Sequence, residues 1–276
     1  MTGARLRSLR VYVPLALYAI FLLFPFYFML VTSFKQDQEL LSTPNPLLIY
    51  HWTIAQVTGL LSGTSYLQWF ANTMEVALGT TLLSVAVSYI TAYAIIRLRF
   101  PGSQAFGTAI FLAYIVPPAI LFIPLAEILI QLHWFDKLWA LIPIYATFIV
   151  PFCTWVLIGF LKSIPRELEE AARVDGASNL LIMLRIIFPV AIPGVITSAI
   201  FAFTLAWNEY LYALVYMSSS GNKTVSVGIT SELISGDVYQ WGQIMAGALI
   251  GIVPALLAYF FFAEYYVAGM SGSLKD

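Results

Sequence analysis

Six long apolar runs constrain this chain more than any other feature of its sequence. Crossing about 30 Å of hydrocarbon takes about 20 helical residues, and each run has about that length. The sequence therefore predicts an all-α membrane protein with six transmembrane helices. The predicted spans are residues 11–31, 74–96, 106–130, 138–161, 189–215 and 244–262.

Composition excludes a water-soluble fold. Hydrophobic residues make up 61% of the 276 residues and charged residues only 10%, whereas soluble domains carry about 45–50% and about 25%. A soluble core of this size could not bury so much apolar surface, so the solvent is lipid. The single cysteine, Cys153, and the two distant histidines, His51 and His133, predict no disulfide, metal site or cofactor.

The first apolar run has two interpretations, a retained membrane helix and the core of a cleaved signal peptide, because basic residues precede it. Run 11–31 is too long for such a core, and no small-residue cleavage site follows Val31. We therefore expect a retained membrane helix with a cytoplasmic N-terminus.

The distribution of Lys and Arg predicts the orientation in the membrane. With the N-terminus inside, the outer loops (32–73, 131–137 and 216–243) hold Lys35, Lys137 and Lys223. Both termini, the loop 162–188 and the tail 263–276 are then cytoplasmic. The inner set is Arg5, Arg7, Arg10, Arg97, Arg99, Lys162, Arg166, Arg173, Arg185 and Lys275.

The loop 162–188 is charged and glycine-broken between two apolar runs. Pro165 suits the first position of a helix, and Ser163 is a candidate cap. Glu169 and Arg173 are spaced to pair at i, i+4, and Gly176 can end the helix in the left-handed conformation. Residues 177–185 can form a second helix leading to Pro189. The acidic residues of the first turns, which suit the positive end of the helix dipole, are Glu167, Glu169 and Glu170.

Small and apolar side chains on this predicted helix suggest a docking surface. Ile164, Leu168, Ala171 and Ala172 are expected on one face, where the alanines allow another protein's backbone to approach closely. The alternative, judged from these residues alone, is an ordinary solvated amphipathic linker.

The spacing in this loop resembles the cytoplasmic loop of ABC-importer permease subunits. That signature is Glu-Ala-Ala, three residues, Gly, nine residues, Ile, one residue, Leu and Pro. Here it starts at Glu170, places Gly176 and Ile186 correctly, and ends at Pro189, with Phe188 in place of the leucine.

The resemblance covers almost the whole chain and narrows to sugar-type permeases, similar to the second (G-type) permease subunit of maltose importers. Asn72-Thr73, residues 92–102 (Ala-Tyr-Ala…Phe-Pro-Gly), residues 159–168 and Trp207-Asn208-Glu209 match that family. The tail, 267–276, departs from the family pattern at Met270, Ser271, Ser273, Leu274 and Asp276.

The resemblance implies the transmembrane domain of a type I ABC importer: one permease domain over 1–276, with its core at about 70–262. This chain would form half of a pore in a bacterial or archaeal cell membrane. Its implied partners are a second permease subunit, with which it forms a heterodimer, two ATP-binding subunits, an extracytoplasmic solute-binding protein and membrane lipid, with no nucleic acid. The residues implied to couple to the ATPase are Glu169, Glu170, Ala171, Ala172, Asp175 and Gly176.

The chain is not expected to be an enzyme. It has no Gly-x-x-x-x-Gly-Lys-Ser/Thr phosphate loop, so ATP hydrolysis belongs to another polypeptide. An intramembrane hydrolase is disfavoured because Gly-x-Ser-x-Gly and His-Glu-x-x-His are both absent.

Polar groups at membrane depth are candidates for the substrate pathway or a gate. Interhelical hydrogen bonding, packing and interfacial solvation remain alternatives for them. The candidates are Trp207, Asn208, Glu209, Tyr212 and Glu75.

No basic residue falls in the middle of a predicted span, which favours a neutral sugar or oligosaccharide over an anion. An ABC permease for glycerol phosphate or a polyol is the alternative. A secondary transporter fits less well, because it has no need of the loop at Glu170.

Overall fold

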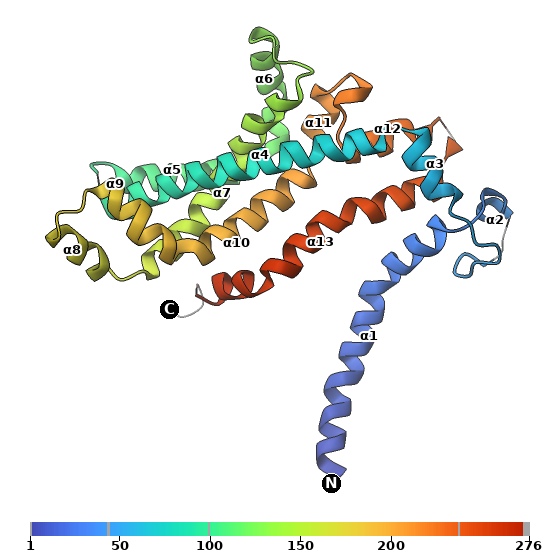
Figure 1. Ribbon diagram of the computed structural model, residues 1–276, viewed down its shortest axis with the longest axis horizontal. Helices are drawn as coiled ribbons and strands as arrows, with labels where there is room; N and C mark the ends of the chain where they lie inside the picture. Colours follow the sequence, from blue (N-terminus) through green and yellow to red (C-terminus); the bar gives the residue numbers. More distant parts are fainter. Residues whose placement is uncertain (1, 43–44, 99, 237, 273–276) are drawn as a thin grey trace. The chain divides into compact units, whose positions relative to one another are not determined.

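The computed structural model describes residues 2–42, 45–98, 100–236 and 238–272 (Figure 1). The predictions for Arg99, Lys275 and the tail beyond Gly272 lie outside the described residues. The helices gather into two compact units. One comprises Met1–Leu67 with Gly228–Val253, and the other Gln68–Val227 with Pro254–Asp276.

Among the described residues, five stretches of helix are long and apolar enough to cross a membrane, and a bent pair of helices makes a sixth candidate. This confirms the all-α membrane fold. The stretches lie within α1 (Thr2–Ser33), α4 with η1 (Tyr66–Tyr93 and Ala94–Leu98), η2 with α7 (Leu138–Ala140 and Leu141–Ser163), α9 to α10 (Asn179–Leu181, η3 Ile182–Ile187 and Phe188–Trp207) and α13 (Trp241–Gly272).

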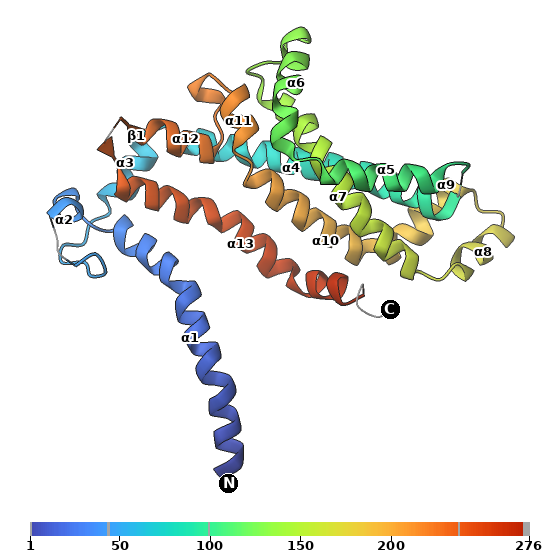
Figure 2. The same ribbon diagram turned by 180° about the vertical axis from the view of Figure 1, so that it is seen from behind.

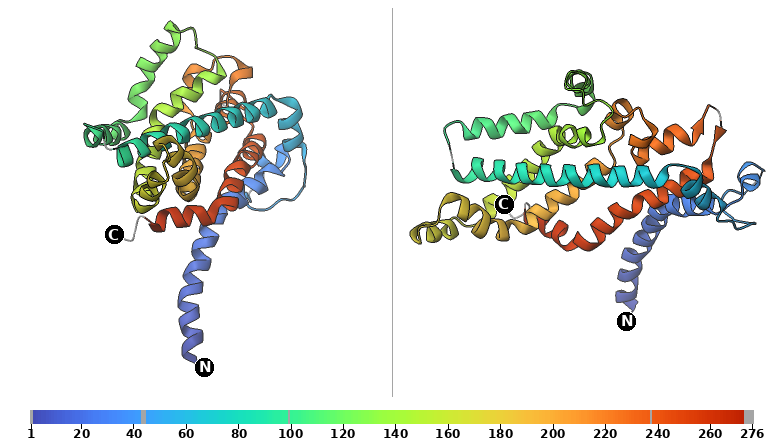
Figure 3. Two further views of the ribbon diagram at one scale, coloured as in Figure 1. Left: turned by 60° about the vertical axis from the view of Figure 1, so that its left-hand side comes forward. Right: turned by 45° about the horizontal axis from the view of Figure 1, so that its top comes forward.

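The predicted third span is not one straight helix. α5 (Ser103–Ile115) and α6 (Pro118–Gln131) meet at an angle of 97°, and Figure 3 shows the two helices turning sharply away from each other. Pro117 and Pro118 explain the break. A residue before proline is pushed out of the helical region, and Val116 is extended, with φ −67° and ψ 121°.

The predicted fifth span is also interrupted. α10 ends at Trp207, and a separate short helix, α11 (Leu211–Tyr216), follows after three residues. Asn208 and Glu209 therefore lie at a helix break. The sequence had suggested instead that they lie inside a continuous span.

α7 is the centre of the second unit (Figure 2), lying between α5 and α10. One stripe of α7 with a spacing of four residues is buried along its length, which is the pattern of a helix with one face in a core. Cys153 is part of this stripe and behaves as a small buried hydrophobe, as expected. The members of the stripe are Leu141, Tyr145, Ile149, Cys153, Leu157 and Leu161, each 0% exposed.

The remaining elements are short. In the first unit, the Tyr66 hydroxyl donates to the Gly247 carbonyl at 2.7 Å, and Glu39 accepts from the backbone amides of Tyr50 and His51. The short elements are α2 (Asp37–Ser42), α3 (Ala55–Gly63), η4 (Ser220–Asn222), α12 (Val225–Glu232) and the antiparallel pair β1 (Ile234–Ser235) and β2 (Val238–Tyr239).

Two glycines provide a matched test of the packing between α7 and α10. A Cβ at Gly194 of α10 lies 2.5 Å from Cγ of Phe160 in α7, whereas a Cβ at Gly159 of α7 meets nothing within 4 Å. Gly194→Ala is expected to destabilise the subunit by about 1–3 kcal/mol through overpacking. The measurement is the thermal unfolding midpoint of the purified subunit. Gly159→Ala should leave this midpoint nearly unchanged, and equal midpoints for the two variants would contradict the packing described.

Candidate functional site

The charged loop forms a short helix, α8 (Glu167–Val174), which projects beyond the ends of α7 and α10 (Figure 1). Its start differs from the prediction. Ser163 belongs to the end of α7 and donates its hydroxyl to the Phe160 carbonyl, so it does not cap α8. Pro165 precedes the helix, and no side chain caps the start at Arg166.

The end of α8 matches the prediction made for Gly176. Gly176 has φ +82°, in the left-handed region that favours glycine. Its amide donates to the Arg173 carbonyl, and the Ala177 amide donates to the Ala172 carbonyl, each at 3.0 Å. This pair of bonds is a Schellman motif. The next helix was predicted to start at residue 177, but it starts two residues later, at Asn179. Ser178 caps this helix by accepting a hydrogen bond from the Leu181 amide.

A buried ion pair attaches α8 to the membrane helices. Nε of Arg97, in η1, lies 2.9 Å from Oε1 of Glu169 in α8, and the two side chains are only 2% and 6% exposed. The second partner of Glu169, Arg173, is 4.0 Å away and half exposed. This pair has the predicted i, i+4 spacing, but it is the weaker contact.

Arg97 also forms hydrogen bonds with backbone carbonyls at the C-terminal end of α7. Its Nη2 donates to the carbonyls of Leu161 at 2.8 Å and Ile164 at 2.7 Å. One guanidinium therefore holds the end of α7, the start of the loop and the buried face of α8. Burying a charge is tolerable only when it is paired and hydrogen-bonded, and Arg97 meets both conditions.

The segments that meet α8 have π-helical geometry, which is often found at functional sites. Arg97 lies in η1, and η3 follows the short α9. The Tyr89 hydroxyl donates to the Met183 carbonyl at 2.7 Å and so links α4 to η3. The end of α4 that continues into η1 is thus bonded to the elements on both sides of the loop.

Four exposed residues, three and four apart, form the outward face of α8: Glu167, Glu170, Ala171 and Val174. Val174 is 89% exposed. The single face expected from the sequence is therefore divided. Ile164 is buried, and Ala172 is half-buried against the core cluster of its own chain, together with Ala177.

The six residues implied to couple to an ATPase are likewise divided between the exposed and the buried sides of α8 and its C-terminal turn. Glu170, Ala171, Asp175 and Gly176 are exposed, whereas Glu169 is buried. The sequence analysis did not assign Arg97, Glu167 or Val174 to this site. For Arg97 a signal existed, because an ionisable residue beside an apolar run is a candidate for a functional contact.

Two candidates for the substrate pathway are core residues in this conformation. The ring of Trp207 stacks on Phe203 and meets Phe70 edge-on, each at 5.5 Å. Tyr212 is 1% exposed, stacks on Phe148, and donates its hydroxyl to the Pro118 carbonyl at 2.7 Å.

Glu209 stabilises the break between α10 and α11. Its carboxylate accepts from the backbone amides of Tyr212 at 3.0 Å and Ala213 at 3.2 Å, satisfying donors that a helix start leaves unpaired. Asn208 is exposed and donates to the Thr204 carbonyl, and Glu75 is exposed on α4. The break thus gathers Trp207, Glu209 and Tyr212.

The loop after α11 is held by side chains from two separate segments of the chain. Nδ2 of Asn72 donates to the carbonyls of Gly221 and Lys223 at 2.7 and 2.9 Å. Oγ1 of Thr73 accepts from the Val225 amide. Asn72-Thr73, noted in the sequence only for its resemblance, therefore anchors this loop on α4.

Asp136 holds the other side of this loop. Its carboxylate accepts from the amides of Ser218 and Ser219 and from the Ser219 hydroxyl. Burial alone raises the pKa of the Asp136 carboxyl, but hydrogen bonds from Ser219, Ser218 and Asn222 outweigh it and lower the pKa below its ordinary value. The anchoring is therefore present at neutral pH and is lost as pH falls through the lowered pKa.

Comparison with known proteins identifies the class. Residues 84–272 match the family described as the binding-protein-dependent transport system inner membrane component, and the chain belongs to this family. It is 33% identical to the inner membrane ABC transporter permease protein YcjP of Escherichia coli (strain K12), over 96% of this chain and 95% of the relative. Among the described residues, no group of His, Cys, Asp or Glu could hold a metal ion.

A relative and a solved structure extend this result. The trehalose/maltose transport system permease protein MalG of Thermococcus litoralis is 31% identical, over 94% of each chain. The fold matches a chain of a bacterial ABC transporter that imports the acidic polysaccharide alginate, with a TM-score of 0.80 at 20% identity, over 96% of this chain and 98% of that chain. The chain is thus a multi-pass ABC permease subunit with the transmembrane fold of a type I importer.

The ion pair at α8 yields a prediction with an internal control. Arg97→Gln leaves the Glu169 carboxylate buried without its near partner, which is expected to cost about 3–5 kcal/mol. Arg173→Gln removes a half-exposed charge 4.0 Å from the same carboxylate, which is worth about 0–1 kcal/mol. Chemical denaturation of the purified subunit in mild detergent measures both. A smaller loss for Arg97→Gln than for Arg173→Gln would contradict the geometry.

Proposed function

We propose that this chain forms half of the pore of an ATP-driven importer for a neutral sugar or oligosaccharide, delivered by a solute-binding protein. The observation that carries the proposal is α8, a helix with an exposed outward face whose buried face is joined to the membrane helices by the Arg97–Glu169 ion pair. The substrate class rests on relatives named for trehalose and maltose.

The outward face of α8 is proposed to dock on an ATP-binding subunit. Glu167 and Glu170 give it negative charge, and Ala171 and Val174 give it a small apolar patch. A basic and apolar cleft on the partner fits this pattern. ATP hydrolysis takes place on that separate subunit, and a second permease subunit supplies the other half of the pore.

Two rigid connections carry motion of α8 into the membrane. The Arg97–Glu169 pair connects α8 to η1 and α4, and the Gly176 turn connects it to α9, η3 and α10. When ATP binding draws the ATPases together, α8 moves, and the bonded helices rock between inward-open and outward-open arrangements. This is a two-state rearrangement biased by ligand binding.

The charges near the pathway favour a neutral substrate. A phosphorylated substrate favours a free cation along its path. Arg97 is already occupied by Glu169 and two carbonyls, and the described residues at the α10–α11 break, Trp207 to Tyr212, carry no positive charge. These observations support a sugar over a glycerol phosphate.

The orientation follows from the same assignment: both termini and α8 face the cytoplasm, and the loop at Gly221 faces outward. A cysteine introduced within 177–181 should be shielded from membrane-impermeant thiol reagents in intact cells, whereas a cysteine at Gly221 should be labelled. Native Cys153 is fully buried, which keeps the background low. Labelling within 177–181 from outside overturns both the orientation and the docking assignment.

The Gly176 turn tests the coupling role directly. Gly176→Val is expected to abolish sugar uptake while the subunit stays in the membrane, because a β-branched residue adopts the left-handed conformation poorly. Gly176→Asn is the matched variant, since asparagine tolerates this conformation, and it should retain most of the uptake. The measurement is uptake of radiolabelled sugar normalised to membrane level. Normal uptake by Gly176→Val would show that α8 is not the coupling element.

A further inference from the structure

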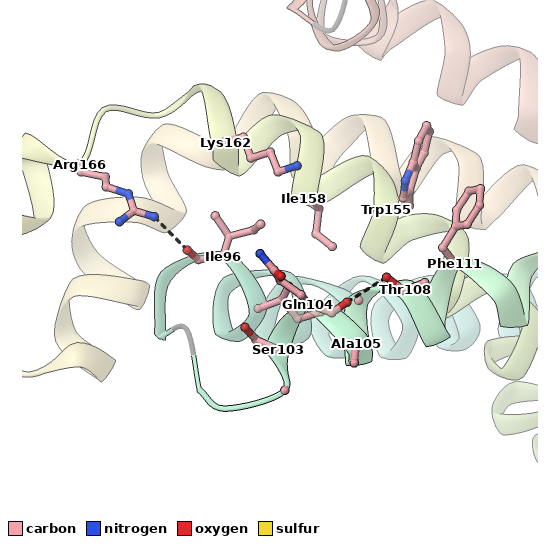
Figure 4. A pocket seen from close by; sticks show the side chains of 13 residues that line it. Ile96, Ser103, Gln104, Ala105, Thr108, Phe111, Trp155, Ile158, Lys162 and Arg166 are labelled. Atoms are coloured by element: carbon pink, nitrogen blue, oxygen red, sulfur yellow. Dashed lines mark hydrogen bonds between the residues drawn. The ribbon is translucent and has the colours of Figure 1, made fainter.

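A wide pocket opens near the start of α8, between the first half of α5 and the second half of α7. It has a volume of about 1140 Å³. Lys162 and Arg166 lie at one end, with the Gln104 side chain across from them, and Phe111 and Trp155 lie at the other end (Figure 4). Neither the coupling route nor the substrate pathway uses this pocket.

Two cationic side chains, Lys162 and Arg166, lie at the polar end of the pocket. None of the described residues that line it is acidic. Glu169 is paired with Arg97, and Glu167 lines a neighbouring hollow of about 390 Å³ that Lys162 and Arg166 share. Arg166 donates from Nη2 to the Ile96 carbonyl at 3.3 Å, which places its guanidinium at the rim.

Uncharged hydrogen-bond donors also lie at the polar end of the pocket. The first turn of α5, including Ser103, Gln104 and Ala105, lines the pocket. Here the positive end of the dipole of a 13-residue helix adds to the two cations. The Thr108 hydroxyl also lines the pocket, although it donates to the Gln104 carbonyl.

The other end of the pocket is apolar and open. Trp155 is 57% exposed and Phe111 39% exposed, and their rings lie 5.9 Å apart. Ile158 continues this apolar wall toward Lys162. A ligand that fills the pocket therefore needs an anionic head and an apolar body. A soluble phosphate meets only the first requirement.

We propose that this pocket binds an anionic phospholipid of the cytoplasmic leaflet, with its phosphate between Lys162, Arg166 and Gln104 and an acyl chain along Phe111 and Trp155. Basic pockets between membrane helices on the cytoplasmic side suit such headgroups, and tryptophan suits the interface. The choice of leaflet rests on the orientation in the proposed function. A lipid held there contacts α5 and α7 next to the Arg97 anchor and stabilises their packing.

The test is retention of phosphatidylglycerol by the complete transporter, assembled with its partner permease and ATPases, measured by native mass spectrometry. Lys162→Gln and Arg166→Gln should each weaken retention about fivefold relative to the unaltered complex, with phosphatidylcholine retention unchanged. Arg185→Gln is the control, because Arg185 is exposed and lies outside the pocket lining. It should retain the lipid normally.

Three results overturn the proposal. Equal loss in Arg185→Gln shows general surface attraction, and displacement of the lipid by inorganic phosphate shows a soluble-anion site. A photo-crosslinking residue at Phe111 that captures a protein subunit and no lipid shows an interface. The readout does not require transport. Lipid retention without sugar uptake contradicts only the proposed function, and sugar uptake without selective retention contradicts only the lipid site.

Discussion

The buried contact between Arg97 and Glu169 is the interaction on which the arrangement around α8 depends. A salt bridge removed from water gains little net stability unless its remaining hydrogen-bonding groups are also satisfied. Here one guanidinium serves a carboxylate and two carbonyls at a point where α7 ends and α8 begins. Losing either charge leaves the other buried, so this attachment is either intact or strongly destabilised. A connection of that kind can transmit motion from an exposed helix to a membrane helix without absorbing it.

Elsewhere in the second unit, backbone groups at helix breaks are satisfied by side-chain hydrogen bonds. Helix breaks at Val116 and at Asn208 leave backbone groups that lipid cannot satisfy. Glu209 accepts from the first amides of α11, and the hydroxyls of Tyr212 and Tyr216 donate to the carbonyls of Pro118 and Phe122 in α6. The two broken segments thereby hold each other.

Local sequence signals predicted a large part of this molecule. Apolar runs predicted the long helices because their length is fixed by bilayer thickness. The left-handed conformation of Gly176 at the end of α8 was predicted correctly, because a helix end of this kind depends only on the residues next to the glycine. The break at Pro117-Pro118 also had a local signal, the paired prolines. It was overridden by the hydropathy of the whole run 106–130, since hydropathy measures apolarity and not straightness.

The contacts that define the site were less predictable because they join distant segments. Nothing near Arg97 in the sequence identifies Glu169 as its partner, and nothing near Asn72 identifies the loop at Gly221. The division of α8 into a buried and an outward face depended on where α7 ends, and that end was misjudged when Ser163 was taken as a cap. Once the helix start is known, the spacing of Glu167, Glu170, Ala171 and Val174 follows from helical geometry.

The central claim is that the outward face of α8 touches the ATP-binding subunit. The most direct measurement replaces Val174, which is 89% exposed at the C-terminal end of that face, with a photo-crosslinking amino acid in the assembled transporter. The crosslinked product is then identified by mass spectrometry. A crosslink to the ATP-binding subunit is expected from position 174 and none from position 238, which is 67% exposed in β2. A crosslink to that subunit from position 238, with none from position 174, would contradict it.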